Sequence, residues 1–250
     1  MSLPRPLWPY PRIIAHRGGG VLAPENTLAA LRLARNMGFR GIEFDVRLCA
    51  DGSPVLMHDE SVDRTTNGSG RVTDLDFVAL GRLDAGGWFG NEYLGEPLPA
   101  FAAACALCRE AGLWANIELK SEPGLEAQTG TTVARMAKLL WAGAHLPPLI
   151  SSFSTEALEA ARKEAPELPR GLLCSEIPHD WKATMDGLEC ASLHAAWEHL
   201  GHEAVREIHS AGFGVMAYTV NESEAALDLL QWSVDALVTD QLERIGPAFA

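Results

Sequence analysis

The sequence predicts an α/β protein: a single-domain (β/α)₈ TIM barrel over residues 1–250, with a small insertion after the second strand. Two observations support this fold class. Short apolar runs alternate with segments of helical periodicity, and such alternation builds parallel strands joined by right-handed crossovers. Eight strand–helix units also fit a chain of 250 residues, which is the usual size of such a barrel. The alternative is a doubly wound open sheet, which needs fewer strands.

The first part of the chain supplies two strands and one helix. A strand at about 12–16 precedes a helix over Thr27–Met37, in which apolar residues recur at helical spacing. Asn26 or Thr27 stands at the place of the helix N-cap. The run Gly41–Leu48 alternates apolar and polar residues with period two, which predicts the second strand.

Residues 60–97 interrupt this rhythm after an extra apolar run at Pro54–Asp59. They are rich in Gly, Asn, Asp and Thr, and a structureless loop of that length is uncommon in a compact domain. We therefore expect a small folded insertion that covers one end of the barrel. From residue 98 onward we expect helices at about 98–111, 125–142, 155–165, 180–187, 201–211 and 222–232, strands at 113–120, 149–153, 170–174, 190–194, 214–220 and 236–240, and a short final helix.

The overall charge limits the classes of partner. The formal net charge is −13 and the pI is near 5.0. This argues against nucleic acid or an anionic membrane surface as the main partner. A small anionic substrate stays compatible with it, because a metal ion and a few local cations dominate at close range.

Cysteine usage and the start of the chain bear on disulfide bonds and on targeting. Five irregularly spaced cysteines do not form a disulfide framework, and Cys105 and Cys108 suit small core positions in an alanine-rich helix. The first eleven residues contain four prolines and no apolar core, so we expect neither a signal peptide nor a membrane span. Cytoplasmic localisation is the default expectation.

Three carboxylates are expected near the carboxyl ends of neighbouring strands, where barrel enzymes gather their reactive groups. Glu43 and Asp45 share one face of the second strand, and Glu118 comes from the next barrel strand. Both faces of a parallel strand are covered, so these carboxylates need a cation or a partner such as Arg47. Oxygen ligands without cysteine favour Mg²⁺ or Ca²⁺ over Zn²⁺. The alternative is a purely structural ion-pair cluster.

Two histidines and two cations are expected beside these carboxylates. His16 and His58 each end a short apolar run, and a histidine pair can serve as general acid and general base. Arg17 and Lys120 would supply fixed positive charge for a phosphate group. In a competing interpretation, Lys120 is the Schiff-base nucleophile of a carbon–carbon lyase, but this leaves the three carboxylates unexplained.

Taken together, these stretches resemble the glycerophosphodiester phosphodiesterase family, in the family's order and over nearly the whole chain. The resemblance implies a metal-dependent barrel that hydrolyses deacylated glycerophospholipids to glycerol 3-phosphate and an alcohol. It also implies that residues 60–97 are the family's insertion. The matching stretches are His16-Arg17-Gly18, Pro24-Glu25-Asn26-Thr27, Glu43-x-Asp45, His58-Asp59, Arg64-Thr-Thr-Asn-Gly-Ser-Gly70, Glu118-Leu-Lys120, Ser152-Phe153 and Tyr218-Thr-Val-Asn221.

The resemblance also assigns roles to individual residues. Phe153 would line the substrate pocket, and Tyr218 stands where the family usually has tryptophan, in the wall that holds the glycerol or the leaving group. His16 and His58 would be the acid–base pair, Glu43, Asp45 and Glu118 the metal ligands, and Arg17 and Lys120 the phosphate-binding residues.

Several choices remain open from the sequence. No Ser or Cys stands out as a nucleophile, so we expect the 2-hydroxyl of the substrate itself to attack phosphorus. Lysophospholipase D-type activity and a non-catalytic glycerophosphodiester-binding barrel are the alternative functions. The choice between Mg²⁺ and Ca²⁺, the preferred alcohol and the oligomeric state stay undetermined.

Overall fold

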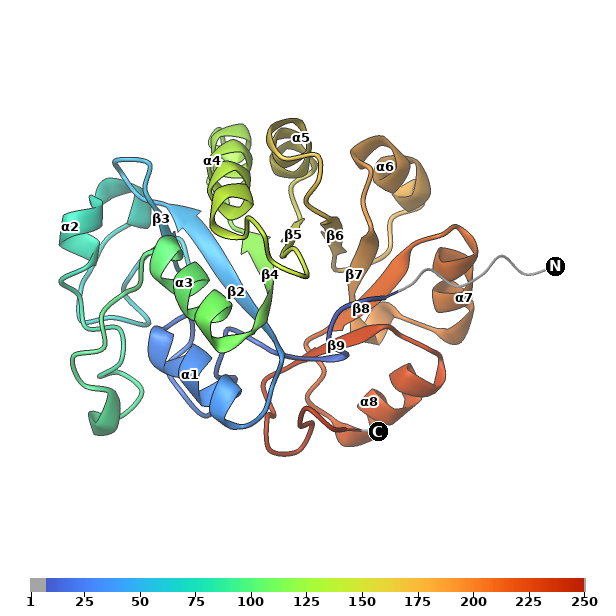
Figure 1. The fold of residues 1–250 in the computed structure, drawn as a ribbon, viewed down its shortest axis with the longest axis horizontal. Helices are drawn as coiled ribbons and strands as arrows, with labels where there is room; N and C mark the ends of the chain where they lie inside the picture. Colours follow the sequence, from blue (N-terminus) through green and yellow to red (C-terminus); the bar gives the residue numbers. More distant parts are fainter. Residues whose placement is uncertain (1–7, 250) are drawn as a thin grey trace.

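The computed structural model describes residues 8–249 and has eight parallel strands closed into a barrel with helices on the outside (Figure 1). The strands follow the order β1-β9-β8-β7-β6-β5-β4-β2, and a β1–β2 pairing closes the ring. The predicted (β/α)₈ barrel is therefore confirmed. A ninth strand, β3, pairs antiparallel with the end of β2.

The strands are short and the helices span about one to four turns. The strands are β1 Ile13–Ala15, β2 Gly41–Leu48, β3 Pro54–Leu56, β4 Trp114–Leu119, β5 Leu149–Ser152, β6 Arg170–Cys174, β7 Ser192–Ala196, β8 Gly214–Tyr218 and β9 Ala236–Thr239. The helices are α1 Leu28–Asn36, α2 Phe77–Leu80, α3 Phe101–Ala111, α4 Glu126–Leu140, α5 Thr155–Glu164, α6 Trp181–Leu188, α7 His202–Ser210 and α8 Ser223–Gln231, and three 3₁₀ turns lie at Val72–Asp74, Asn91–Tyr93 and Trp197–His199.

Successive side chains on a strand point to opposite faces, so each strand contributes to two layers, one packed against the helices and one inside the barrel. On β2, Ile42, Phe44 and Val46 belong to the main apolar cluster between strands and helices. Glu43 and Asp45, in between, point the other way, into the barrel. All eight residues of β2 are buried, as expected for a parallel strand covered on both faces.

The barrel interior changes from apolar to charged along its axis. Its floor, at the amino ends of the strands, holds the apolar side chains of Ile14, Trp114, Leu149 and Met216. Tyr10 covers this floor by stacking on Trp114, with ring centroids 4.5 Å apart. The opposite end, which we call the mouth, collects the polar residues at the carboxyl ends of the strands.

Residues 60–97, together with β3 and its neighbouring residues, form a small apolar cluster separate from the main one. Figure 1 shows this segment beside β2 and β3. The segment contains α2, two of the 3₁₀ turns and isolated bridges such as Ser61–Arg71. The cluster consists of Cys49, Val55, Met57, Val62, Val72, Leu80, Ala85 and Leu98.

Two expectations about the second half of the chain need correction. The residues that follow β9 form turns, and no helix occurs there within the described part. The strand expected at 190–194 instead spans Ser192–Ala196. Cys190 and Ala191 belong to the connection between α6 and β7. The expected boundary was wrong because helix ends and strand starts are weakly marked in sequence.

The cysteines and the hydropathy agree with their sequence-based interpretation. All five cysteines are free and buried. Between residues 8 and 249, no helix has the length and apolar character needed to cross a membrane. The expectation of no signal segment rests partly on residues 1–7, which lie outside the described residues.

Candidate active site

Three buried carboxylates meet at the mouth. Glu43 and Asp45 come from β2 and Glu118 from β4, where the register places Asp45 opposite Glu118. One oxygen from each side chain lies within 4.8 Å of the other two. The sequence prediction that these three groups converge is therefore correct in its geometry.

The electrostatics of these carboxylates suit a bound divalent cation. Burial and the neighbouring Asp45 charge raise the pKa of Glu43 well above its ordinary value. Burial and Asp45 also raise the pKa of Glu118. Glu43 Oε1 is buried without a hydrogen-bond partner in the described part of the chain. A hard cation would supply that partner and favour the ionised form of all three groups, so the residues fit Mg²⁺ or Ca²⁺.

Asp45 is the most firmly held of the three. Its Oδ2 accepts a hydrogen bond from Asn26 Nδ2 at 2.8 Å, and its backbone N–H donates to Asn26 Oδ1 at 3.0 Å. Burial opposes its ionisation, but the charges of Lys120 and Arg17 outweigh burial and lower the pKa of Asp45. The Asn26 side chain is therefore hydrogen-bonded to Asp45 and does not cap the helix. The N-cap of α1 is Thr27, whose Oγ1 accepts a hydrogen bond from Ala30 N–H.

His16 follows β1 and is oriented by the carboxylate of Asp240, which directly follows the last strand, β9. Its Nδ1 lies 2.6 Å from Asp240 Oδ1, and its Nε2 lies 3.9 Å from Glu43 Oε2. Asn221 Nδ2 donates to the other oxygen of Asp240 at 3.0 Å. Burial disfavours the imidazolium, but the hydrogen bond to Asp240 and the Glu43 charge outweigh it and raise the pKa of His16.

His58 follows β3, and its side chain is 33% exposed, so it can meet a ligand from solvent. Its Nδ1 lies 2.7 Å from Asp59 Oδ1. Burial lowers the pKa of His58, against the opposing charge of Asp45. Arg64 binds both oxygens of Asp59, at 2.6 Å and 3.0 Å, and thereby holds this carboxylate in place.

The two predicted phosphate-binding cations lie between the carboxylates. Arg17 donates through Nη1 to Glu25 at 2.8 Å, and its Nε lies 3.5 Å from Asp45 Oδ2. Lys120 Nζ lies 3.5 Å from Asp45 Oδ1 and forms a close ion pair with Glu118. Both cations are mostly buried beside the carboxylates and within reach of any anion bound there.

Two aromatic side chains border the mouth on the β5 and β8 side. Phe153 and Tyr218 meet edge to face, with ring centroids 6.1 Å apart. Lys120 Nζ lies 5.6 Å from the centroid of the Phe153 ring. Phe153 is 47% exposed, whereas the Tyr218 hydroxyl donates to the Cys174 carbonyl at 2.9 Å. An aromatic wall therefore adjoins the predicted phosphate-binding lysine.

Arg47 was expected as a partner of the carboxylates, and His194 ends the strand expected at 190–194, but both have other partners. Arg47 binds Glu122 at 3.0 Å and the His58 carbonyl at 3.0 Å, not the three carboxylates. His194 is fully buried inside the barrel, and its Nε2 is 2.8 Å from Ser192 Oγ. The shifted start of β7 explains this, because it moves His194 from the strand end to its middle.

Asp240, Asn221 and Arg64 hold the two histidines or their carboxylate partners in place, but no functional role was expected for any of them from the sequence. Asp240 and Asn221 lie more than 200 residues from His16, and Arg64 lies in the insertion. Asp240 carried one signal, its position at the end of a strand. Gly20 lies directly against the Asp240 backbone, because a Cβ at position 20 would lie 2.2 Å from the Asp240 carbonyl oxygen.

Comparison with known proteins shows the family of this chain. A sequence profile of the glycerophosphoryl diester phosphodiesterase family matches residues 16–244. A glycerophosphodiester phosphodiesterase of Caldanaerobacter subterraneus is 34% identical over 235 residues, covering 93% of this chain and 95% of the relative.

Solved structures extend the comparison. A phosphodiesterase of Oleispira antarctica in complex with the product sn-glycerol-3-phosphate is 39% identical, with a TM-score of 0.91 and coverage of 94% of this chain and 95% of that one. A glycerophosphodiester phosphodiesterase of Agrobacterium tumefaciens is 28% identical, with a TM-score of 0.78 and coverage of 94% and 98%. The profile match and the identity over nearly the full length show that this chain belongs to the glycerophosphoryl diester phosphodiesterase family.

Proposed function

We propose that this protein is a metal-dependent phosphodiesterase that hydrolyses glycerophosphodiesters to glycerol 3-phosphate and an alcohol. The observation that carries the proposal is the convergence of Glu43, Asp45 and Glu118 at the mouth, with His16 and His58 beside them. The names of the relatives support the substrate class, as does the glycerol 3-phosphate bound by the Oleispira antarctica neighbour.

The charged residues divide into those that hold a cation and those that face the substrate. Glu43, Asp45 and Glu118 would hold Mg²⁺ or Ca²⁺, which when bound neutralises negative charge on the phosphoryl oxygens. Arg17 and Lys120 add fixed positive charge on either side of Asp45. Positive groups arranged in advance stabilise the charge of a phosphoryl transition state without reorganising during the reaction.

The two histidines would carry the protons. With Nδ1 directed at a carboxylate, each ring presents Nε2 for transfer. One histidine accepts the proton of the substrate 2-hydroxyl as its oxygen attacks phosphorus, and the other donates a proton to the leaving alcohol oxygen as the phosphorus–oxygen bond breaks. Water then opens the cyclic phosphate with these two roles reversed, and glycerol 3-phosphate is released.

The aromatic residues Phe153 and Tyr218 would form the wall against the organic part of the substrate. The exposed Phe153 ring lies on the rim, and the Tyr218 ring is fixed behind it by its hydroxyl. This arrangement gives an apolar surface next to Lys120, which suits a ligand that combines a phosphate with a carbon skeleton.

The test is release of glycerol 3-phosphate from glycerophosphocholine, with and without chelator, by wild type, His16→Ala and His179→Ala. We expect chelator to abolish release and His16→Ala to lower kcat by about 100-fold or more. His179 is exposed in the loop before α6, so His179→Ala should match wild type. Chelator-resistant release, or full activity of His16→Ala, would contradict the proposal.

A further inference from the structure

A small cavity of about 30 Å³ lies inside the barrel, between the carboxylates of the mouth and the apolar floor. Glu43 lines it on the side of the mouth, and Met216 and Val238 of the floor line it on the other side. The polar side chains of Asn116, on β4, and His194, on β7, also line it. A buried cavity needs roughly 10–15 Å³ to hold a water molecule, so this one has room for water.

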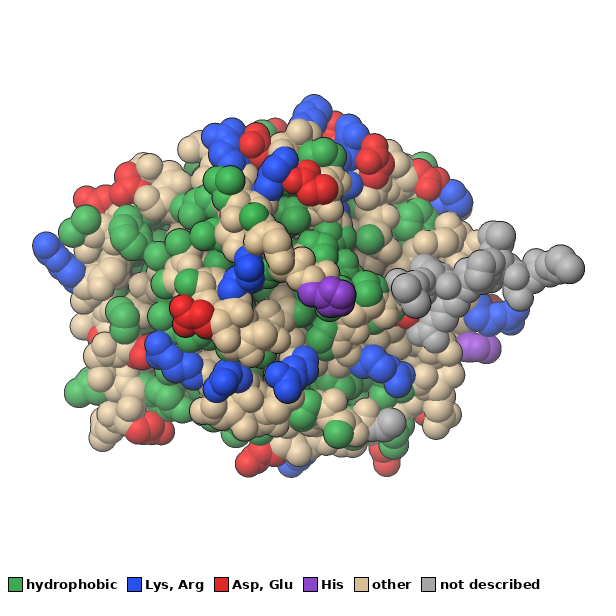
Figure 2. Space-filling view, in the orientation of Figure 1, with side chains coloured by type: hydrophobic (Ala, Val, Ile, Leu, Met, Phe, Trp, Pro, Cys, Tyr) green, Lys and Arg blue, Asp and Glu red, His purple; other side chains and the backbone are tan. Residues whose placement is uncertain are grey.

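Three of the lining residues each carry a buried polar atom without a hydrogen-bond partner among residues 8–249. These atoms are Glu43 Oε1, Asn116 Oδ1 and His194 Nδ1. Asn116 is 3% exposed and His194 is 0% exposed, whereas the Lys and Arg side chains drawn in blue over α1 and toward α8 in Figure 2 lie at the surface. Leaving a buried polar atom unpaired is costly, so each of the three needs a partner inside the barrel.

The His194 ring is fixed through its other nitrogen. Its Nε2 lies 2.8 Å from Ser192 Oγ. Gly171, on β6, leaves room for the ring, because a side chain at position 171 would collide with it. Nδ1 belongs to the same rigid ring and therefore keeps one position. Water both donates and accepts hydrogen bonds, so it can satisfy Nδ1 in either neutral tautomer of the ring.

Asn116 stands beside Glu43 in the barrel wall. Their α-carbons are paired in the register of β2 and β4, and both side chains line the cavity. Glu43 Oε2 already accepts a hydrogen bond from the Arg17 N–H at 2.9 Å, which leaves Oε1 for other partners. A carboxylate oxygen has two lone pairs, so Oε1 can bind a cation and accept a hydrogen bond from water at the same time.

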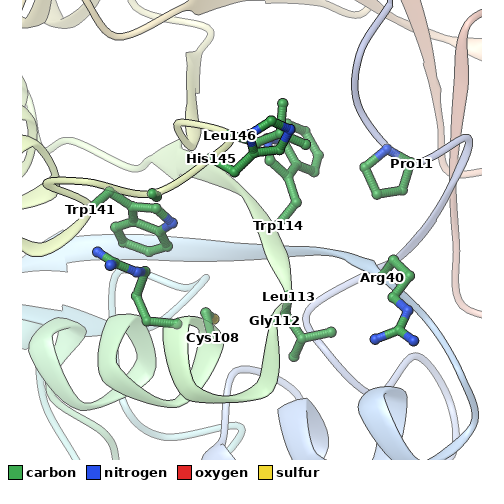
Figure 3. A pocket seen from close by; sticks show the side chains of 11 residues that line it. Pro11, Arg40, Cys108, Gly112, Leu113, Trp114, Trp141, His145 and Leu146 are labelled. Carbon is green, nitrogen blue, oxygen red and sulfur yellow. The ribbon is translucent and has the colours of Figure 1, made fainter.

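The floor separates this cavity from a larger one of about 320 Å³ at the amino ends of β2 and β4 (Figure 3). Trp114 lines the larger cavity, Met216 and Val238 line the small one, and all three belong to the floor. Arg40 and His145, which line the larger cavity, are exposed to solvent. A molecule in the small cavity therefore contacts the proposed metal site and not this outer surface.

We propose that the small cavity holds buried water, hydrogen-bonded to Asn116 Oδ1, His194 Nδ1 and Glu43 Oε1, and that Asn116 and His194 position Glu43 through it. Both are positioning residues, since they act on the metal ligand and not on the substrate. Groups that orient a metal ligand commonly change metal affinity by about 10–100-fold when they are lost. The positioning role rests on the proposed function, because it needs the metal, whereas the water site does not.

The positioning role is tested by calorimetric titration of the full chain with Mg²⁺ and with Ca²⁺. Asn116→Leu keeps the size of the side chain but offers no hydrogen-bonding atom, so we expect Kd for the ion to rise by about tenfold. Asn116→Ser is smaller but polar, and additional water can replace the missing atoms, so Kd should stay within about threefold of wild type. A role in packing alone predicts the reverse order, because serine leaves a void that leucine fills.

Ile150→Val is the control. It removes a buried methyl group from the layer of β5 that packs against the helices, so it should bind both ions like wild type. The proposal is overturned if Asn116→Leu binds the ion as tightly as wild type, or if Asn116→Ser binds it more weakly than Asn116→Leu.

A crystal structure of the wild-type chain at high resolution tests the water site directly. We expect ordered water within hydrogen-bond distance of Asn116 Oδ1 and His194 Nδ1, and a dry cavity would overturn the proposal. If wild type binds neither ion, the proposed function and the positioning role both fail, and ordered water in the cavity would still confirm the water site.

Discussion

At the scale of single residues, His16 and His58 at the mouth are each oriented by a carboxylate at Nδ1. Asp240 faces Nδ1 of His16 and Asp59 faces Nδ1 of His58. A carboxylate in this position sets the ring orientation and stabilises the imidazolium that forms during proton transfer. The environments still differ, since the pKa of His16 is raised and that of His58 is lowered.

Asp240→Asn tests the orienting role of this carboxylate. The amide keeps the shape but cannot stabilise a charged His16, so we expect kcat to fall by about 100-fold or more while KM changes little. Steady-state kinetics on glycerophosphocholine measure both constants. Asp180 is exposed and lies before α6, so Asp180→Asn is the control. A rise in KM alone would mean that Asp240 acts in binding instead.

His194 belongs to the barrel core, and its burial couples stability to pH. Burial lowers the pKa of His194 to about 3, from 6.5. Below pH 6.5 the unfolded chain therefore binds a proton that the folded chain does not, and stability falls as pH decreases toward 3.

His194→Gln should remove this dependence. We expect the unfolding free energy of wild type to fall by about 1 kcal/mol more per pH unit than that of the variant between pH 6 and 4. Urea denaturation at several pH values gives these free energies. Parallel pH profiles for the two proteins would show that His194 is not the group responsible.

Gly171 packs directly against the buried His194 ring, because a Cβ at position 171 would lie 2.4 Å from His194 Nε2.

At the scale of elements, the insertion is tied to the barrel by arginines. Arg64 binds Glu25 of the β1–α1 turn at 2.7 Å and 2.8 Å, in addition to Asp59. Arg71 binds Glu122, which in turn binds Arg47 of β2. These contacts place the insertion against the mouth, where it helps to position His58 and Arg17.

Arg64→Gln should loosen this attachment. Arg64 holds down the pKa of Asp59, and it lowers the pKa of Glu25 against the effect of burial. The stabilisation is therefore present above pH about 4.3 and is lost as pH falls through the folded pKa values.

We expect Arg64→Gln to cost about 1 kcal/mol at pH 7, because the arginine is 46% exposed, and less near pH 3. Thermal unfolding at both pH values checks this. Arg82 of the insertion is exposed and forms no ion pair with residues 8–249, so Arg82→Gln should leave the melting temperature unchanged at either pH. An equal loss at both pH values for Arg64→Gln would exclude the electrostatic explanation.

At the scale of the whole molecule, the barrel gathers three carboxylates whose mutual repulsion is only partly offset by Arg17 and Lys120. The predicted metal should therefore stabilise the fold. At a concentration of 100 times Kd, a bound ion adds about 2.7 kcal/mol, which corresponds to about 5–10 °C in Tm for a chain of this size.

Melting curves with and without Mg²⁺ or Ca²⁺ measure this effect. Asp45→Asn should remove most of the increase, because it removes one of the three proposed metal ligands. Glu156→Gln, at an exposed position of α5, should keep the increase in full. An increase in Asp45→Asn equal to that in wild type would place the bound ion elsewhere.

Most of the fold follows from local patterns along the chain. The period of two in β2 placed Glu43 and Asp45 on one face, and strand alternation predicted that Glu118 would join them. These predictions hold because a parallel barrel leaves few arrangements for such a pattern. The missing final helix and the shifted β7 show where local patterns are too weak to set boundaries.

The sequence alone determined the barrel, the carboxylate cluster and the family resemblance, because each follows from residue types at fixed spacing within elements and from the order of those elements along the chain. Only the tertiary structure decided which partner each side chain takes. In it, Asp240 pairs with His16, Asn26 donates to Asp45, and Arg47 donates to Glu122. These contacts join segments far apart in the chain, and closure of the barrel, rather than local propensity, brings them within hydrogen-bond distance.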